Sequence, residues 1–156
     1  MGDSYLYWED FTPGMCVTCG PKKVTREEII EFSSQFDPQP MHLDEEAAKE
    51  SVFGALAASG WHSCAILMSM LCEGYLLNSS SMGAPGVDEV KWLMPIHAND
   101  TLMVKVTVLE TRSSASRPTM GLTRMNYEMT NQNNDVVMTM HNTAMFGRRT
   151  SEDISS

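Results

Sequence analysis

The second half of the chain alternates between apolar and polar positions. The clearest case is Leu102–Leu109, where Lys105 and Thr107 alternate with apolar neighbours. A period of two is typical of a β-strand with one buried face. Short segments rich in turn-forming residues separate this strand from its neighbours. The pattern predicts strands at Val90–Leu93, Leu102–Glu110, Leu122–Asn131 and Val136–Met145, and a short strand at Met15–Thr18.

Two short helices are predicted after the first strand. Thr25-Arg26-Glu27-Glu28 forms a capping box ahead of apolar residues, and predicts a helix from Thr25 to Gln35. Asp44 is expected to cap the second helix, because acidic residues follow it in the first turn, where the helix dipole favours them.

A longer apolar segment runs from Gly60 to Leu77. It lacks clean amphipathicity, and a helix that is apolar on all sides is normally buried. A membrane span of this length is the competing interpretation. His62 and Glu73 within the segment argue against it, so we expect a buried central helix.

These elements predict the fold class. No alternation of strands and helices indicates a parallel sheet, so we expect an α+β domain in which a strongly bent antiparallel sheet wraps one long helix. The 156 residues suffice for a single domain with its own core. We place this domain at residues 1–149. Residues 150–156 are mostly polar and acidic, and are expected to be a disordered tail.

Composition excludes several classes of function. The net charge of −9 argues against a nucleic acid partner, because phosphate binding requires a basic surface. Four cysteines in a chain of this length do not indicate a disulfide framework. Cys16 and Cys19 form an isolated Cys-x-x-Cys without the further ligands that zinc requires. We expect no metal and no cofactor, and because the N-terminal residues do not resemble a signal peptide, we expect a cytoplasmic protein with reduced thiols.

The candidate chemistry lies between the two short helices. Asp37 and His42 are five positions apart, with Pro38 and Pro40 between them. Each proline restricts its own φ and the conformation of the preceding residue, so this segment cannot continue a helix. General acid–base catalysis needs two titratable groups on a support that does not relax. Proline followed by acidic residues is also common in an ordinary loop that leads into a helix.

The segment Phe36–Ala48 resembles the signature of the MaoC-like dehydratases, the (R)-specific enoyl-CoA hydratases of the hot-dog fold. The family motif is Asp-x-Asn-Pro-x-His, and Asp37, Pro40 and His42 match it. Gln39 replaces the usual Asn. Weaker similarities cover nearly the whole chain, at 58–62, 86–95 and 99–102.

The resemblance implies an activity and a set of site residues. Asp37 and His42 would act on one water molecule that adds to, or leaves, the 2,3-double bond of an enoyl thioester. The Gly60 N–H would face the thioester carbonyl, as free N–H groups at a helix N-terminus suit an enolate oxygen. Substrate contacts are expected from the remaining motif residues and the start of the central helix, namely Gln39, Ser59, Trp61 and His62.

Partners and alternatives follow from the same resemblance. The substrate would be an acyl thioester of CoA, or of acyl carrier protein, and the chain would form a homodimer or a higher even oligomer. We expect neither a membrane nor a nucleic acid partner. A hot-dog acyl-CoA thioesterase would not need His42. A non-catalytic acyl-binding subunit of a hetero-oligomeric hydratase is made conceivable by Gln39. The presence of both Asp37 and His42 argues against each alternative.

Overall fold

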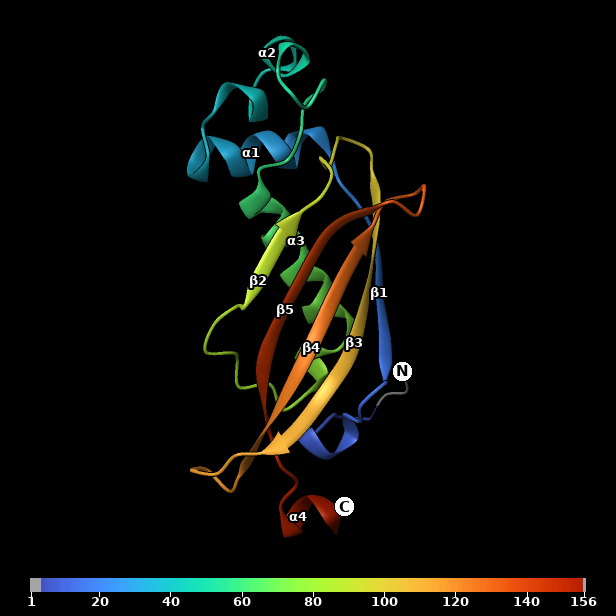
Figure 1. Ribbon diagram of the computed structural model, residues 1–156, viewed down its shortest axis with the longest axis vertical. Helices are drawn as coiled ribbons and strands as arrows, with labels where there is room; N and C mark the ends of the chain where they lie inside the picture. The colour runs from blue at the N-terminus through green and yellow to red at the C-terminus, as the bar shows by residue number, and fades with distance from the viewer. Residues whose placement is uncertain (1–3, 156) are drawn as a thin grey trace.

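Five antiparallel strands form one sheet that curves around a central helix in the computed structural model, which describes residues 4–155 (Figure 1). The sheet order is β1-β3-β4-β5-β2, so β1 and β2 are the edges. This confirms the predicted α+β hot-dog arrangement. The strands are β1 (Cys16–Lys23), β2 (Glu89–Trp92), β3 (Thr101–Ser113), β4 (Met120–Thr130) and β5 (Val136–Gly147).

Alternation along the strands explains which face of the sheet is buried. In β3, four alternate side chains are almost fully buried, while those between them lie on the opposite face. Antiparallel pairing carries the pattern to β4, where Val106 lies opposite Tyr127 and Val104 opposite Met129, all buried. Alternate side chains point to one face of a sheet, so one face of this sheet contributes to the hydrophobic core. The four buried β3 residues are Leu102, Val104, Val106 and Val108.

The central helix α3 (Gly60–Gly74) lies against the inner face of the sheet (Figure 1). The prediction of a helix buried on all sides was wrong, because α3 buries one stripe only. Trp61 and Met68 remain 64% and 47% exposed. The spacing of the buried positions follows the helical repeat of 3.6 residues. They are His62, Ser63, Ile66, Leu67, Met70 and Leu71.

The end of α3 also differs from the prediction. The helix stops at Gly74, and Leu76–Asn78 form a separate 3-10 turn, η3. A Cβ atom at Gly74 would overlap Cys19 of β1, so the helix can approach the strand this closely only through a glycine. Tyr75 caps the end of α3, and its side chain is buried.

Strand β1 is longer than the predicted Met15–Thr18. Its pairing with β3 shifts between Cys19 and Lys22, which is the signature of a β-bulge. Gly20 lies in this bulge with φ +115°, a conformation that favours glycine. The bulge lets the chain pass Pro21, which has no N–H, and pair with β3 again at Lys22.

The two predicted short helices form at one end of the sheet. Helix α1 (Arg26–Phe36) is capped by Thr25, and α2 (Glu45–Glu50) by Asp44, as predicted. Figure 1 shows both at the same end of the molecule, beyond the N-terminal end of α3. They frame the segment that contains the 3-10 turn η2 (Pro40–His42).

The opposite end of the molecule carries the 3-10 turn η1 (Trp8–Asp10) and the C-terminal helix α4 (Ser151–Ile154) (Figure 1). Residues 150–156 were expected to form a disordered tail, and residue 156 lies outside the described residues. In the structure, Thr150 caps α4 and the Tyr7 hydroxyl donates to Asp153. Within residues 4–155 no helix has both the length and the apolar character needed to cross a membrane. The four cysteines are free.

Candidate functional site

The loop after α1 holds the two candidate catalytic side chains. Asp37 is the C-cap of α1, and its backbone N–H donates to Ser33 O. Pro38 cannot continue the helix, and Pro40 occupies the first position of η2, where a missing N–H costs nothing. The prolines therefore convert the helix end into a tight turn that places His42 back toward Asp37.

The orientation of the His42 ring is set by a backbone carbonyl. His42 Nδ1 lies 2.7 Å from Ala57 O, and since a carbonyl only accepts, Nδ1 carries the proton. The carbonyl is itself held in place, because Ala57 pairs with His97 in an antiparallel bridge and Ala58 N donates to Ile96 O. In the tautomer whose single proton is on Nδ1, the imidazole presents an unprotonated Nε2 on its other side.

Nε2 of His42 faces the carboxylate of Asp37, at 3.4 Å from Oδ2. Two donors already occupy that carboxylate: the Ser59 hydroxyl donates to Oδ2 at 2.6 Å, and Gln39 Nε2 donates to Oδ1 at 2.7 Å. The hydrogen bond from Ser59, followed by that from Gln39, lowers the pKa of Asp37; partial burial opposes this, and His42 adds to the lowering. Asp37 is therefore an ionised acceptor at neutral pH.

The N-terminus of α3 begins beside this pair. Ser59 is the N-cap, and its Oγ accepts from Trp61 N at 3.3 Å. Gly60 is the first helical residue, so its N–H has no partner within the helix. Backbone N–H groups at this position, together with the helix dipole, favour negative charge.

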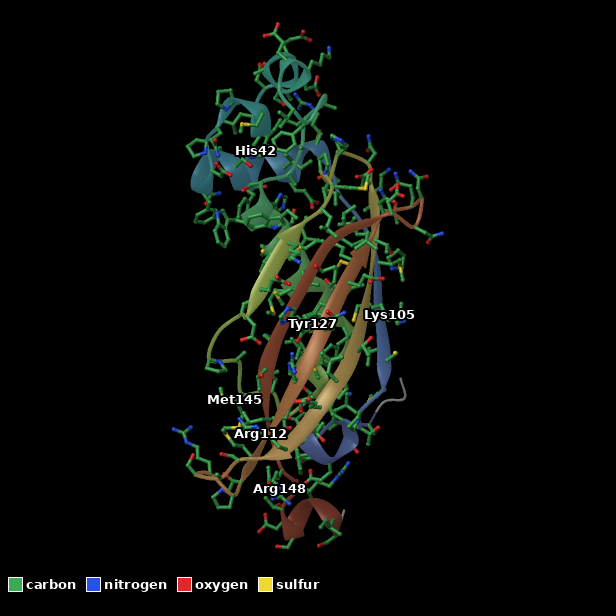
Figure 2. All side chains as sticks on the ribbon, in the orientation of Figure 1. His42, Lys105, Arg112, Tyr127, Met145 and Arg148 are labelled. Atoms are coloured by element: carbon green, nitrogen blue, oxygen red, sulfur yellow. The ribbon has the colours of Figure 1, made fainter. Side chains whose placement is uncertain are left out.

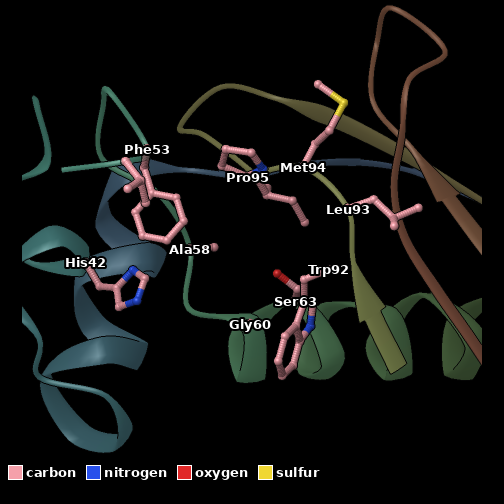
Figure 3. A pocket seen from close by; sticks show the side chains of 11 residues that line it. His42, Phe53, Ala58, Gly60, Ser63, Trp92, Leu93, Met94 and Pro95 are labelled. Atoms are coloured by element: carbon pink, nitrogen blue, oxygen red, sulfur yellow. The ribbon is translucent and has the colours of Figure 1, made fainter. Parts of the chain in front are cut away.

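A cavity of about 410 Å³ opens between these elements. Figure 3 shows Gly60 and Ser63 on α3 along one side, His42 and Phe53 at one end, and Leu93, Met94 and Pro95 across from them. Among its described lining residues, His42 is the only one with a titratable side chain; Asp37 is not among them, although its Oδ2 lies 3.4 Å from His42 Nε2. The remaining lining residues are Val52, Ala58, Trp92 and Ile96.

None of the four residues predicted to contact the substrate is among the described lining residues of this cavity. Gln39 is exposed and binds Asp37. Ser59 is fully buried, also against Asp37. Trp61 is exposed and packs edge-on against Trp92 at 5.5 Å between ring centroids, whereas His62 is buried.

His62 faces α1. Its ring stacks on Phe32 with centroids 4.6 Å apart, and its Nε2 lies 4.0 Å from Glu28 Oε1. The Glu28 carboxylate also binds Lys22 at 3.0 Å. The structure therefore places His62 in the contact between α1 and α3.

Sequence reasoning missed most of the apolar lining. Phe53 and Met94–Ile96 lie outside the elements that the hydrophobic pattern predicted, whereas Leu93 ends the predicted strand Val90–Leu93. Ser63 was also missed; its hydroxyl donates to Ser59 O, and it lies one helical turn beyond Ser59. The signal that could have found Ser63 is this spacing, since residues four apart share a helix face.

The described lining of the cavity contains no Lys or Arg side chain that could bind CoA phosphates. Figure 2 shows Arg112 and Arg148 at the end of the sheet opposite to His42. Among residues 4–155, no group of three or more His, Cys, Asp or Glu side chains could hold a metal ion.

The chain is similar to known proteins in both sequence and fold. Residues 11–133 match the MaoC like domain. The crystal structure of the MaoC-like dehydratase from Rhodospirillum rubrum superposes with a TM-score of 0.85 at 37% identity, covering 93% of this chain and 99% of that one. The uncharacterized protein YdeM of Bacillus subtilis (strain 168) is 29% identical over 102 residues, which is 65% of this chain and 72% of YdeM.

A more distant structure shares the fold alone. The R-hydratase PhaJ1 from Pseudomonas aeruginosa has a TM-score of 0.74 at 18% identity, covering 93% of this chain and 88% of PhaJ1. The family match extends over more than half of the sequence and includes both Asp37 and His42. The chain therefore belongs to the MaoC-like dehydratases, a family of hydratases and dehydratases.

Proposed function

We propose that the protein adds or removes water across the 2,3-double bond of an enoyl thioester. The expected carrier of the acyl group is CoA, and acyl carrier protein is the alternative carrier. The observation that supports this most is the Asp37–His42 pair. Asp37 Oδ2 lies 3.4 Å from His42 Nε2, which accepts hydrogen bonds in the tautomer that is protonated at Nδ1 alone. Two acceptors cannot bind each other without a proton between them, and a water molecule beside them can donate one hydrogen to each.

The held water is then oriented for addition. With both hydrogens engaged, the oxygen lone pairs of this water would be free to attack a substrate in the cavity that His42 lines. One of the pair takes a proton as the water oxygen bonds to C3, and a proton is delivered to C2. The product carries OH on C3 and H on C2, the two side chains return to their starting states, and dehydration is the reverse. Positioned acid–base groups contribute about 10²–10⁴-fold to such rates.

The Gly60 N–H supports the same reaction. As the double bond takes up the water oxygen, negative charge develops on the thioester oxygen. A backbone donor at the helix N-terminus stabilises this charge without reorganising. Gly60 lines the same cavity as His42, so both groups can act on one thioester.

The remaining lining argues for an uncharged acyl chain. Phe53, Leu93, Met94 and Ile96 are apolar, and Val52 borders the cavity while almost fully exposed. An ionised carboxylate at the far end of an acyl group would lose its hydration here without a cationic partner among the described lining residues. We therefore propose enoyl groups without a second carboxylate as substrates, crotonyl among them.

We also propose that the protein is a homodimer. Edge strand β2 pairs with β5 on one side only, and exposed edges of this kind favour pairing with another chain. Trp92 on β2 is 48% exposed and contacts Trp61 on the exposed side of α3. A second copy would cover these side chains.

The test is ultraviolet loss of the enoyl-thioester band with crotonyl-CoA, run beside a thiol-release assay. Asp37→Asn and His42→Gln are each expected to lower hydration by about 10²-fold or more, with unchanged circular dichroism. Thiol release that survives His42→Gln would identify a thioesterase instead. Absence of both signals across short and medium acyl chains would refute catalysis on these substrates.

His97→Gln is the matched control. His97 Nδ1 also bonds a backbone carbonyl, Leu56 O at 3.1 Å, but His97 is not part of the cavity lining. Asp44→Asn preserves a good N-cap residue on α2 and serves the same purpose for Asp37. Both controls are expected to hydrate crotonyl-CoA at the wild-type rate.

A further inference from the structure

We propose that Ser59 is a positioning residue, which holds the Asp37 carboxylate in register with the N-terminus of α3. The role goes beyond the substrate contact expected for Ser59 from the sequence. It rests on the proposed hydratase function for its effect on rate, while the contact itself can be measured without any substrate.

The geometry places Ser59 behind the catalytic pair. Its Oγ donates to Asp37 Oδ2 at 2.6 Å, and the same oxygen faces His42 Nε2 at 3.4 Å. Ser59 is 0% exposed and is not part of the cavity lining. We therefore infer that it acts on a substrate in this cavity indirectly, through the groups that its hydroxyl and carbonyl hold.

Ser59 also belongs to the first turn of α3. Its Oγ accepts from Trp61 N at 3.3 Å, and its carbonyl accepts from Ser63 N at 2.9 Å. One hydroxyl thus caps the helix as an acceptor and restrains the carboxylate as a donor, which a hydroxyl can do at once. Because Gly60 follows directly, Ser59 couples the position of the carboxylate to that of the Gly60 N–H.

The second donor to Asp37 cannot replace this contact. Gln39 is exposed, so water can take over its hydrogen bond to Oδ1. Ser59 is shielded from water, and loss of its hydroxyl would leave Oδ2 without that donor. Hydrogen bonds to charged groups in such surroundings are stronger than those at the surface.

The electrostatics agree with the geometry. Ser59 is the largest of the influences that lower the pKa of Asp37. From the packed elements, η2 contributes His42 as a titratable neighbour, whereas the loop and α3 contribute the uncharged Gln39 and Ser59. Without the hydroxyl the pKa of Asp37 should rise, and its carboxylate should be free to rotate away from the water site.

The first test follows Asp37 directly by ¹³C NMR of its carboxyl group, assigned by loss of the signal in Asp37→Asn. In Ser59→Ala the titration midpoint should move to higher pH, and in Ser59→Thr, which keeps a hydroxyl, it should return toward wild type. Thr25→Ala is the stability control, since it removes the N-cap of α1 and leaves Asp37 untouched. An unchanged midpoint in Ser59→Ala would overturn the proposal. If Ser59→Thr does not fold, the proposal is tested by comparing the Asp37 titration midpoint of Ser59→Ala with that of Thr25→Ala.

The second test is the pH profile of crotonyl-CoA hydration. In Ser59→Ala we expect kcat to fall about 10²-fold with KM little changed, because misplacement of a reacting group by about 1 Å has costs of this size. The acid limb of kcat/KM should move to higher pH, and Thr25→Ala should move neither. A fall in activity with an unmoved acid limb and an unmoved Asp37 titration would assign Ser59 a purely structural role. A wild type that hydrates nothing, with the NMR shift observed, would refute the hydratase and leave the contact established.

Discussion

The indole of Trp92 lies directly over Gly60. A Cβ added at Gly60 would come within 2.6 Å of the Trp92 ring. The glycine therefore lets the β2 tryptophan cover the first turn of α3, beside the N–H proposed to bind the thioester oxygen. Trp92 is also 48% exposed, so it has solvent to move into.

Gly60→Ala is accordingly expected to reduce activity far more than stability. The half-exposed indole can swing outward, and the free energy of unfolding should change by less than about 1 kcal/mol. The methyl group and the displaced ring should disturb the oxyanion site and lower hydration by about 10²-fold. Thermal unfolding, tryptophan emission and the crotonyl-CoA assay measure the three effects. Gly86→Ala, where a Cβ meets nothing within 4 Å, is the control.

Substitution of Gly121, in contrast, should reduce the stability of the protein. A Cβ there would overlap the indole of Trp8, which is restrained from two sides: Nε1 donates to Leu122 O at 3.2 Å, and the Arg148 guanidinium lies 5.2 Å above the ring. Since this indole cannot yield easily, Gly121→Ala is expected to lower the free energy of unfolding by about 1–3 kcal/mol. Urea denaturation beside Gly86→Ala measures it. Equal stability of the two variants would show that Trp8 moves freely.

The contrast between local and distant contacts explains what could be predicted from the sequence. The caps Thr25 and Asp44 depend on residues three positions away, and both were predicted correctly. The alternation in β3 is local in the same sense. The end of α3 at Gly74 depends on Cys19, far earlier in the chain, and no local pattern reports that contact.

The residues of the candidate site show the same contrast between local and distant contacts. Asp37 and His42 lie on one short loop, so the motif and its prolines already placed them together. The donor to Asp37 comes from Ser59, 22 residues later, and the opposite wall of the cavity comes from Leu93–Ile96. The predicted capping box forms only in part. The Thr25 hydroxyl accepts from Glu28 N, but the Glu28 carboxylate binds Lys22. Such contacts arise from packing rather than from local propensity.

His62 should make stability depend on pH. Burial lowers the pKa of His62 from its usual 6.5; Glu28 opposes this, and Lys22 adds to it. Below about pH 6.5 the unfolded chain binds a proton that the folded protein resists, so the free energy of unfolding falls until the lowered folded pKa is reached. His62→Phe keeps a ring against Phe32 and removes this titration. Its stability between pH 7 and 5 should decline less steeply than that of wild type.

The comparison isolates His62 because all other titrating groups are present in both proteins. Urea denaturation at several pH values provides the two curves, and their difference should grow as the pH falls. Curves that run parallel would show that His62 is protonated as readily in the folded protein as in the unfolded chain. That outcome would mean that the contact with Glu28 compensates fully for burial.

The proposed homodimer can be tested on the exposed side of α3. Met68 is 47% exposed on this helix, and Ile154 on α4 is 75% exposed at the other end of the molecule. A carboxylate buried in an interface without a partner is unfavourable, so Met68→Glu should shift the protein toward the monomer in light scattering, whereas Ile154→Glu should not. If Ile154→Glu alone dissociates the assembly, the copies meet at the α4 end. If wild type is monomeric at every concentration, the proposed pairing of α3 and β2 is wrong, and the exposed tryptophans Trp61 and Trp92 need another explanation.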